Sequence, residues 1–168
     1  METLKDLNVD IFKLFDENWA LLTAGTPEDF NTMTVSWGSL GTIWCEHDHG
    51  NCYATMYVKP SRYTFNYMEK SDYYTVSFFP KSARRDLAYL GSHSGRDEDK
   101  LAATSLTPVE KPHGTMGFKE ATLTLVCHKL YSDAFKREGI PADIVEKYYN
   151  GEPVHHFYIG EIVDFDEQ

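Results

Sequence analysis

The sequence has few cysteines, no long apolar run and a shortage of basic residues. Three cysteines in 168 residues do not suggest the disulfide framework of a secreted domain. No apolar run approaches the roughly 20 residues of a membrane-spanning helix. The first fifteen residues lack the basic start and apolar stretch of a signal peptide. We therefore expect a cytoplasmic protein that does not act at a membrane.

Several motifs of nucleotide-binding and hydrolytic enzymes are also missing. No Gly-x-Gly-x-x-Gly follows an expected strand, which argues against a dinucleotide-binding Rossmann unit. The sequence has no Walker A loop, no Gly-x-Ser-x-Gly and no zincin helix. A functional site therefore has to be sought in less regular patterns.

The basic residues are few but unevenly placed. The formal net charge is -10, which argues against nucleic acid as a partner. Residues 59–100 nevertheless contain eight Lys and Arg against six Asp and Glu, whereas the rest of the chain has eight against twenty. A locally basic segment in an acidic chain favours a small anionic ligand. An ordinary solvated surface is the alternative.

The residues that are present predict one mainly β domain spanning residues 1–168, with short flanking helices. Apolar and polar residues alternate over several segments, as in half-buried strands. These expected strands are 19–23, 30–44, 53–58, 73–79, 120–131 and 155–165, with a loop over 103–117. Long alternating strands favour an antiparallel sheet or barrel over a parallel sheet.

The strand from Asn31 to Trp37 has two different faces. It alternates Thr32, Thr34 and Ser36 with Met33, Val35 and Trp37. The hydroxyl face could hydrogen-bond the polar edge of a flat ligand, while an apolar residue such as Met33 or Trp37 forms a wall. An ordinary half-buried strand rich in threonine explains the same pattern.

Two segments are candidates for binding an anion. Ser61 is expected to cap a helix that runs to about Lys70, and Arg62 and Thr64 add a charge and a hydroxyl at its positive end. Ser94-Gly95 is expected to turn into a second helix, on which Arg96 and Lys100 share a face. In each case the alternative is an ordinary helix start with solvated charges.

A polar segment rich in potential metal ligands interrupts the strands. Two cysteines and two histidines fall within eight residues: Cys45, His47, His49 and Cys52. Their spacing matches no zinc pattern, so we interpret the segment as a polar hairpin tip. A metal or redox site is the alternative, and we assign no metal ligands.

With these motifs in place, the sequence resembles the flavin reductase-like family of FMN-binding split barrels, and within it the flavoredoxin branch. The resemblance rests on four motifs in order: residues 31–38, residues 58–64, Ser94-Gly95-Arg96-Asp97 with Lys100, and His155 with residues 159–162. They extend over most of the chain from about residue 19. The polar segment 45–52 departs from the pattern and could alter access to the cofactor.

The resemblance implies a six-stranded antiparallel split β-barrel that binds FMN and forms a homodimer. It places residues Asn31 to Trp37 along the flavin ring. It places Ser61, Arg62, Tyr63 and Thr64 at the phosphate, with Ser94, Gly95, Arg96 and Lys100. His155 is implied near the flavin as a modulator, although its neighbour His156 leaves open which histidine faces the pocket.

Two functions are consistent with this family. The first is an FMN-dependent oxidoreductase with NAD(P)H as co-substrate, in which the flavin carries the chemistry and no protein nucleophile is required. The second is a flavoredoxin-type electron carrier, whose acidic surface meets a redox partner protein. Two hypotheses without a flavin remain. One is a metal-binding module at residues 45–52, and the other is a protein that binds a different ligand in the same barrel.

Overall fold

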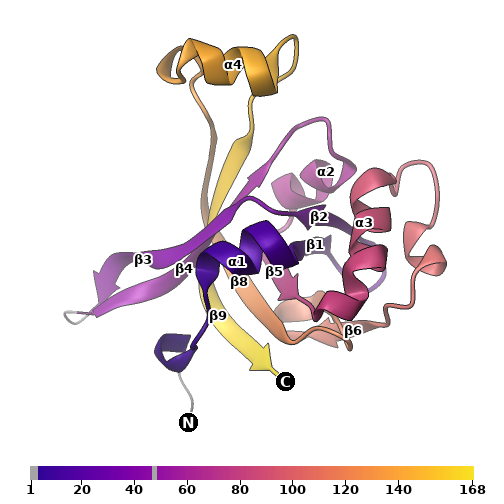
Figure 1. Cartoon of the computed structure of the whole chain (residues 1–168). Coiled ribbons are helices and arrows are strands. Elements are labelled where there is room, and N and C mark those ends of the chain that lie inside the picture. The colour runs from indigo at the N-terminus through magenta and orange to yellow at the C-terminus, as the bar shows by residue number, and fades with distance from the viewer. Residues whose placement is uncertain (1–3, 47–48) are drawn as a thin grey trace.

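The computed structural model of the chain describes residues 4–46 and 49–168. Their main element is one curved antiparallel sheet, with short helices around it (Figure 1). Among these residues, seven strands follow the order β2-β1-β5-β8-β9-β4-β3, and β6 and β7 form a separate pair. The strands are β1 (Ala20–Gly25), β2 (Phe30–Val35), β3 (Gly38–Glu46), β4 (His49–Val58), β5 (Tyr73–Phe78), β6 (Pro108–Lys111), β7 (Thr115–Phe118), β8 (Leu123–Ala134) and β9 (His156–Glu167).

Short helices connect these strands. The α-helices are α1 (Ile11–Lys13), α2 (Tyr63–Lys70), α3 (Arg84–Ser92) and α4 (Ala142–Tyr149), and α1 continues into a π-helical turn at Leu14–Asn18. Single 3-10 turns lie at Leu4–Asp6, Lys81–Ala83, Lys100–Ala103, Pro112–Gly114 and Arg137–Gly139. No helix in the described part of the chain has the length and apolar character needed to cross a membrane.

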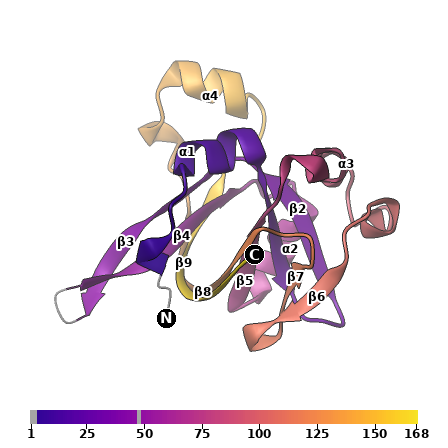
Figure 2. The same cartoon turned by 60° about the horizontal axis from the view of Figure 1, so that its bottom comes forward.

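The link between β2 and β3 requires the sheet to curve. These two strands are its opposite edges, yet only Ser36 and Trp37 separate them in the chain. Two residues span at most about 3.3–3.6 Å each, so the edges must meet at this link. The strands accordingly curve around a common core (Figure 2), which is the split-barrel arrangement.

The alternating sequence fills both faces of the sheet. On β1, Leu22 points into the barrel, where it joins a cluster that includes Tyr74, Tyr158 and Met68. Its neighbour Leu21 points outward to a second cluster. Helix α3 covers that second cluster with Leu87 and Leu90, beside Phe79, Leu106 and Phe118. The period-two pattern thus places one core inside the barrel and one beneath α3.

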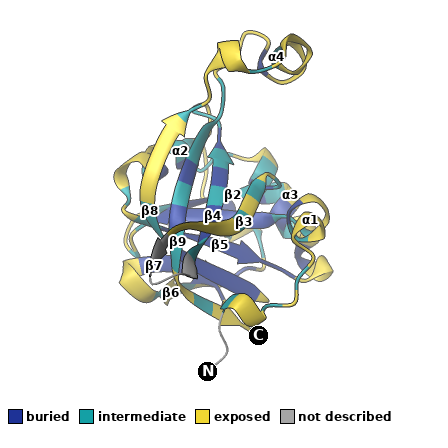
Figure 3. Cartoon of the chain, turned by 90° about the vertical axis from the view of Figure 1, so that its left-hand side faces the viewer, coloured by how far each residue is buried: buried dark blue, intermediate teal, exposed yellow. Residues whose placement is uncertain are grey.

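Strands β8 and β9 extend beyond the barrel as a two-stranded arm, with α4 at its tip (Figure 1). Most of the tip is exposed to solvent, in contrast to the buried centre of the sheet (Figure 3). Apolar side chains remain on the arm, because Phe135 stacks on Tyr57 with ring centroids 5.7 Å apart and packs on Phe157 at 5.6 Å.

The fold class is confirmed, and three details differ from the expectation. The sheet has seven strands rather than six. The expected strand 30–44 is two strands at opposite edges, because the chain leaves one edge at Ser36 and joins the other at Gly38. The expected loop 103–117 contains most of the β6–β7 hairpin, whose tight turn uses Gly114 at φ 65°. Short strands divided by proline lack a clear alternating pattern.

The close approach of β9 to the core gives a test of this packing. Gly160 pairs with Ala54 on β4. A Cβ atom there would lie 2.8 Å from Cζ of Tyr74 and 2.9 Å from Cβ of Cys127, too close for either neighbour. We expect Gly160→Ala to lower the free energy of unfolding by about 1–3 kcal/mol through overpacking, measured by urea denaturation.

The matched control is Gly41→Ala on β3. A Cβ atom at Gly41 meets no other atom within 4 Å. Its stability should stay within about 0.5 kcal/mol of the native chain, as for most surface substitutions. Equal effects of the two substitutions would contradict the packing described here.

Candidate functional site

Two adjoining cavities lie beside β2, with volumes of about 290 and 140 Å³. They share Met33 and Arg62 and together form one groove, which we call the β2 groove. The larger cavity is lined by Met33, Thr34, Val35, Ser36, Trp37, Tyr57, Lys59, Arg62, Tyr148 and His155. The smaller is lined by Asn31, Met33, Ser61, Arg62, Tyr63, Thr64, Leu90, Gly91, Ser92, His93, Ser94, Arg96 and Lys100.

The backbone of β2 supplies one side of this groove. Within the described sheet β2 pairs only with β1, so it is an edge strand. Every second residue of an edge strand directs its N–H and C=O groups away from the sheet. These groups can hydrogen-bond the polar edge of a flat ligand, as when a peptide adds to a sheet edge.

The N-terminus of α2 lies at the smaller cavity. The expectation that Ser61 caps this helix is wrong, because a tight turn, closed by Arg62 N–H donating to Lys59 O at 3.0 Å, moves the cap to Arg62. No side chain caps the first N–H groups of α2. The positive end of the helix is therefore directed at the cavity without a competing side chain, which suits an anion.

Two arginines approach the same cavity from different segments. Arg62 donates from Nη1 to Gly91 O at 3.5 Å, and the guanidinium of Arg96 lies 5.2 Å from the ring centre of Tyr63. Both arginines are exposed, and neither forms an ion pair with a carboxylate of the described residues. Their remaining donors can reach a phosphate with the bidentate geometry that arginine favours.

Lys100 is the buried cation of the site, with 5% of its surface exposed. Its ammonium group donates to Leu90 O at 2.9 Å and His93 O at 3.1 Å, at the carboxyl end of α3. Burial and then the charge of Arg62 lower the pKa of Lys100 to about 8, while Glu98 acts in the opposite direction. An anion that enters the cavity therefore stabilises the charged form of Lys100.

The segment that carries Arg96 and Lys100 is not the expected α-helix. The backbone N–H of Arg96 donates to the hydroxyl of Ser94 at 3.2 Å, which holds a turn. Asp99 then starts only a 3-10 turn, Lys100–Ala103. Serine and aspartate compete for backbone N–H groups, which favours turns over a continuous helix. Both cations still line the same cavity.

Gly95 allows this turn to lie directly on β2. The amide of Asn31 donates to the hydroxyl of Thr64 at 2.6 Å, and both side chains are buried. A Cβ atom at Gly95 would collide with Oδ1 of Asn31 and lie 3.4 Å from the Tyr63 ring. Asn31, Thr64 and Gly95 therefore join the turn, β2 and α2 around the cavity.

The hydroxyl groups of β2 are used within the protein. The Thr32 hydroxyl donates to Leu22 O at 3.3 Å and accepts from Thr23, and the Thr34 hydroxyl donates to Leu87 O at 2.5 Å. Thr32 lines neither cavity of the groove. Ligand contacts from β2 and the link after it must therefore come mainly from the β2 backbone, from Ser36 and from the side chains of Met33 and Trp37.

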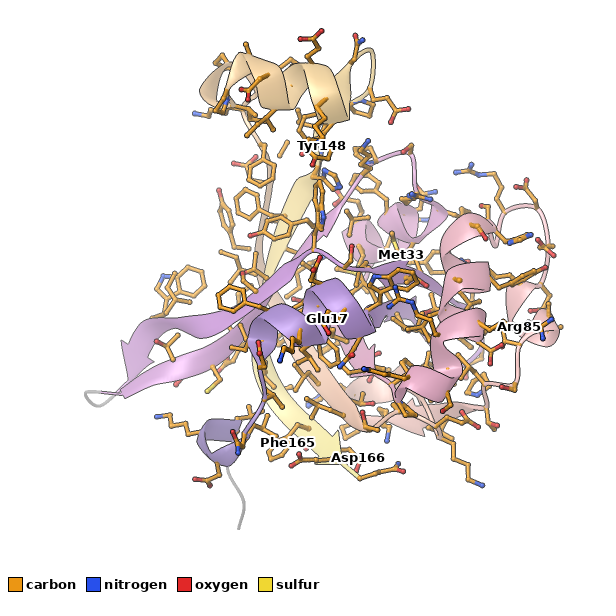
Figure 4. The ribbon with its side chains drawn as sticks, viewed as in Figure 1. Glu17, Met33, Arg85, Tyr148, Phe165 and Asp166 are labelled. Atoms are coloured by element: carbon orange, nitrogen blue, oxygen red, sulfur yellow. The ribbon has the colours of Figure 1, made fainter. Side chains whose placement is uncertain are left out.

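Aromatic side chains close the other end of the groove. The ring of Trp37 lies 4.8 Å from His155 and 5.5 Å from Tyr148, measured between ring centres. Tyr148 comes from α4 and Met33 from β2, so the arm and the barrel meet here (Figure 4). Trp37 is 44% exposed, which leaves this wall accessible from solvent.

His155 and His156 point to opposite sides of the chain. His155 lines the larger cavity, and burial together with Lys59 and Arg62 lowers its pKa to about 4. Its imidazole is therefore neutral at pH 7. His156 packs edge-on against Phe65, with ring centres 4.9 Å apart. The histidine that faces the groove is His155.

The family comparison agrees with this arrangement. The model of the family described as "Flavin reductase like domain" matches residues 12–168, almost the whole chain. The chain belongs to the flavin reductase-like family. This confirms the family predicted from the four motifs, while membership of the flavoredoxin branch stays a prediction. No curated protein matches the sequence.

Solved structures of similar fold support the flavin reductase-like architecture. An FMN-binding protein from Thermus thermophilus matches with a TM-score of 0.69 and 17% identity, over 100% of this chain and 81% of that chain. Flavoredoxin from Methanosarcina acetivorans matches with 0.68 and 21%, over 100% and 76%. An NADH:FAD oxidoreductase from Streptomyces globisporus matches with 0.66 and 12%, over 90% and 75%. At these identities the likeness shows the fold.

Seven groove residues of this flavin reductase-like chain were not predicted as site residues: Tyr57, Lys59 and Tyr148 at the larger cavity, and Leu90, Gly91, Ser92 and His93 at the smaller. Lys59 stands within the motif 58–64, so its neighbours could have indicated it. Tyr148, and Tyr149 beside His155, could not be found from the sequence. They lie on α4, which reaches the groove only because the long β8–β9 arm carries it there.

A larger cleft of about 690 Å³ lies elsewhere, between α2 and the ends of β1 and β7. Its lining includes Asp29, Glu69 and Asp72 but only Tyr63 from the predicted site. We assign the site to the smaller β2 groove because Arg62, an uncapped helix start and a free strand edge meet there. The larger cleft has three carboxylates in its lining and does not include Arg62, so it is less suited to an anion.

The metal reading of segment 45–52 is left without a structural test. His47 and the side chains of Cys45 and His49 lie outside what the structure describes, so the set of Cys45, His47, His49 and Cys52 cannot be assembled. Among the side chains that the structure describes, which leave out residues 1–3 and 45–50, no three histidine, cysteine or acidic groups are placed as metal ligands.

Proposed function

We propose that this protein binds FMN in the β2 groove and acts as an FMN-dependent oxidoreductase that accepts hydride from NAD(P)H. The observation that carries the proposal is the meeting of Arg62, Arg96 and Lys100 beside the uncapped start of α2, at one end of a free strand edge. A ligand with a phosphate group and a flat ring joined by a short chain fits this arrangement, with the phosphate at the cations and the ring along the strand edge. We place this activity in the cytoplasm.

The donor groups fit such a cofactor. Arg62 and Arg96, with Ser61 and Ser94, would hold the phosphate, and the charge of Lys100 lies behind them. The backbone of β2 would hold the polar edge of the ring. When bound, the flavin supplies the hydride and electron transfer itself, so the protein needs no nucleophile.

The protein side chains then have three tasks. The cations neutralise a phosphate dianion in a chain whose net charge is -10. Met33, Val35 and Trp37 supply apolar walls along the groove. Neutral His155 holds a ring nitrogen toward the larger cavity without adding a charge. The exposed side of Trp37 leaves an approach for a second flat ligand such as nicotinamide.

A second candidate is an electron carrier that exchanges electrons with proteins only. The observation in its favour is the exposed end of β9, which carries Asp164, Asp166 and Glu167, with Lys111 paired to Asp166 at 2.6 Å. A basic redox partner could dock on such a surface. The two candidates share the cofactor and differ in the electron donor.

An absorbance spectrum tests the proposal. We expect the purified protein, supplied with FMN and desalted, to keep flavin bands, and these bands to bleach with NADH or NADPH under nitrogen. Bands that persist with either nucleotide would assign the electron-carrier role. Arg62→Gln with Arg96→Gln should remove most of the retained flavin, because charged hydrogen bonds of about 1.5–3 kcal/mol each are lost. A colourless protein that does not retain FMN would overturn the proposal.

The pKa of Lys100 predicts how FMN affinity depends on pH. Lys100 carries its charge below about pH 8 and loses it above. Above pH 8, binding the phosphate dianion requires Lys100 to take up a proton, so the Kd should rise by up to about tenfold per pH unit. We expect this rise between pH 8 and 9.5 in fluorescence titrations of FMN.

Lys100→Arg is the matched variant, because arginine keeps its charge over this range. Its FMN affinity should stay nearly constant from pH 7 to 9.5, even if it is lower overall. An equal pH dependence in the native chain and in this variant would remove Lys100 as the cause.

We also propose that two copies of the chain form a homodimer that covers the open side of the groove. Beside Trp37 lies an apolar hollow of about 520 Å³, lined among others by Ile11, Phe12, Leu40 and Phe135. Phe12 is 88% exposed. Monomeric proteins rarely expose contiguous apolar surface of this kind, and it continues directly into the site.

Phe12→Lys tests this interface, since a buried unpaired charge opposes association. Size-exclusion chromatography with light scattering should give twice the chain mass of 19.3 kDa for the native protein and the single mass for the variant. Val163→Lys, a surface change on β9 away from the hollow, should remain a dimer. A native protein that is monomeric at micromolar concentration would refute the dimer.

A further inference from the structure

The phenol of Tyr149 contacts the histidine that faces the β2 groove. Tyr149 is the last residue of α4, and only 4% of its surface is exposed. Its hydroxyl lies 2.9 Å from Nδ1 of His155, with the two rings edge to face at 5.6 Å. The other ring nitrogen of His155, Nε2, is not engaged by this contact. The arm thus carries a partner for one nitrogen of the imidazole.

Two cations hold the end of α4 that carries Tyr149. Lys59 donates to Tyr148 O at 3.1 Å and pairs with Glu152 at 3.2 Å. Arg137 donates to Tyr149 O at 3.1 Å. The last carbonyl groups of a helix have no partner within the helix and attract cations. The position of Tyr149 is therefore fixed from both the barrel and the arm, although the arm is exposed.

A hydroxyl and a neutral imidazole can share a hydrogen bond in either direction. A phenol is a stronger hydrogen-bond donor than acceptor, and the unprotonated nitrogen of a neutral imidazole is a strong acceptor. The chemistry of the two groups therefore favours the Tyr149 hydroxyl as the donor and Nδ1 of His155 as the acceptor. A neutral imidazole that accepts at Nδ1 carries its proton on Nε2. Burial, together with the nearby charges of Lys59 and Arg62, lowers the pKa of His155 and favours the neutral imidazole over the imidazolium.

We propose that Tyr149 is a positioning residue that holds His155 in the Nε2–H tautomer and makes its imidazole a fixed hydrogen-bond donor toward the ligand in the groove. A donor at Nε2, beside the cations Lys59 and Arg62, suits an electron-rich oxygen or nitrogen of that ligand. The role toward FMN rests on the proposed function. The tautomer itself does not, so the two parts can be tested separately.

The tautomer is tested on the protein without ligand, by two-dimensional ¹⁵N–¹H NMR of protein with ¹⁵N-labelled histidine. His155→Asn identifies the signals. We expect a protonated Nε2 and an unprotonated Nδ1 in the native chain from pH 8 down to about pH 5. In Tyr149→Phe, which keeps the buried ring but lacks the hydroxyl, we expect averaged signals of two exchanging tautomers. The control is Tyr131→Phe on β8, which removes a hydroxyl that donates to Asp133 at 3.1 Å.

The role toward the ligand is tested by FMN titration of the same proteins. Loss of a fixed donor should raise the Kd of Tyr149→Phe by about three- to tenfold, the effect of one hydrogen bond. His155→Gln, whose amide N–H lies near the place of Nε2–H, should make Tyr149 dispensable. Adding Tyr149→Phe to that variant should then change the Kd by less than twofold.

Three results would overturn the inference. A native His155 protonated at Nδ1 would reverse the hydrogen bond, and an unchanged tautomer in Tyr149→Phe would make Tyr149 irrelevant to it. An FMN affinity equal to that of the native chain in Tyr149→Phe would remove the role toward the ligand. A native chain that does not bind FMN refutes the proposed function instead, and the NMR result still decides the role of Tyr149 toward His155.

Discussion

The link of Ser36 and Trp37 joins the two edges of a seven-stranded sheet, and the position of the groove depends on it. Because two residues must span from one edge to the other, the sheet curves until β2 and β3 meet at the link. Away from the link β2 keeps one edge unpaired within the described sheet. The groove forms along that edge, and the residues of the link form part of its wall.

The electrostatic character of the groove depends on tertiary contacts more than on the number of charges. The chain is strongly acidic, yet Arg62, Arg96 and Lys100 converge on one cavity. Lys100 is buried on the carbonyl end of α3, which offsets the cost of removing its charge from water. Gly95 lets the turn with Arg96 lie on Asn31. A local surplus of cations thus becomes a site for an anion through close packing of three segments.

The arm links the exposed tip of the molecule to the site. Tyr148 packs on Trp37, while Tyr149 reaches His155, and cations from two segments hold the end of α4 that carries both. The aromatic residues that are numerous in the sequence therefore serve three purposes: the core of the barrel, the wall of the groove and the hollow beside Phe12.

The sequence by itself determined the family, the mainly β class and most of the groove residues, because alternation and short motifs are local properties. Among the predicted site residues, those of the segments 31–37, 61–64 and 94–100, with His155, lie along one groove, and of these only Thr32 and Gly95 line neither cavity. Only the tertiary structure decided that residues 30–44 form two strands at opposite edges of the sheet. It also decided that the hydroxyls of Thr32 and Thr34 donate to backbone carbonyls within the protein, and that Arg62 replaces Ser61 as the N-cap of α2. These features depend on partners distant in the chain, such as Leu87 for Thr34 and Tyr149 for the site, which no local pattern specifies.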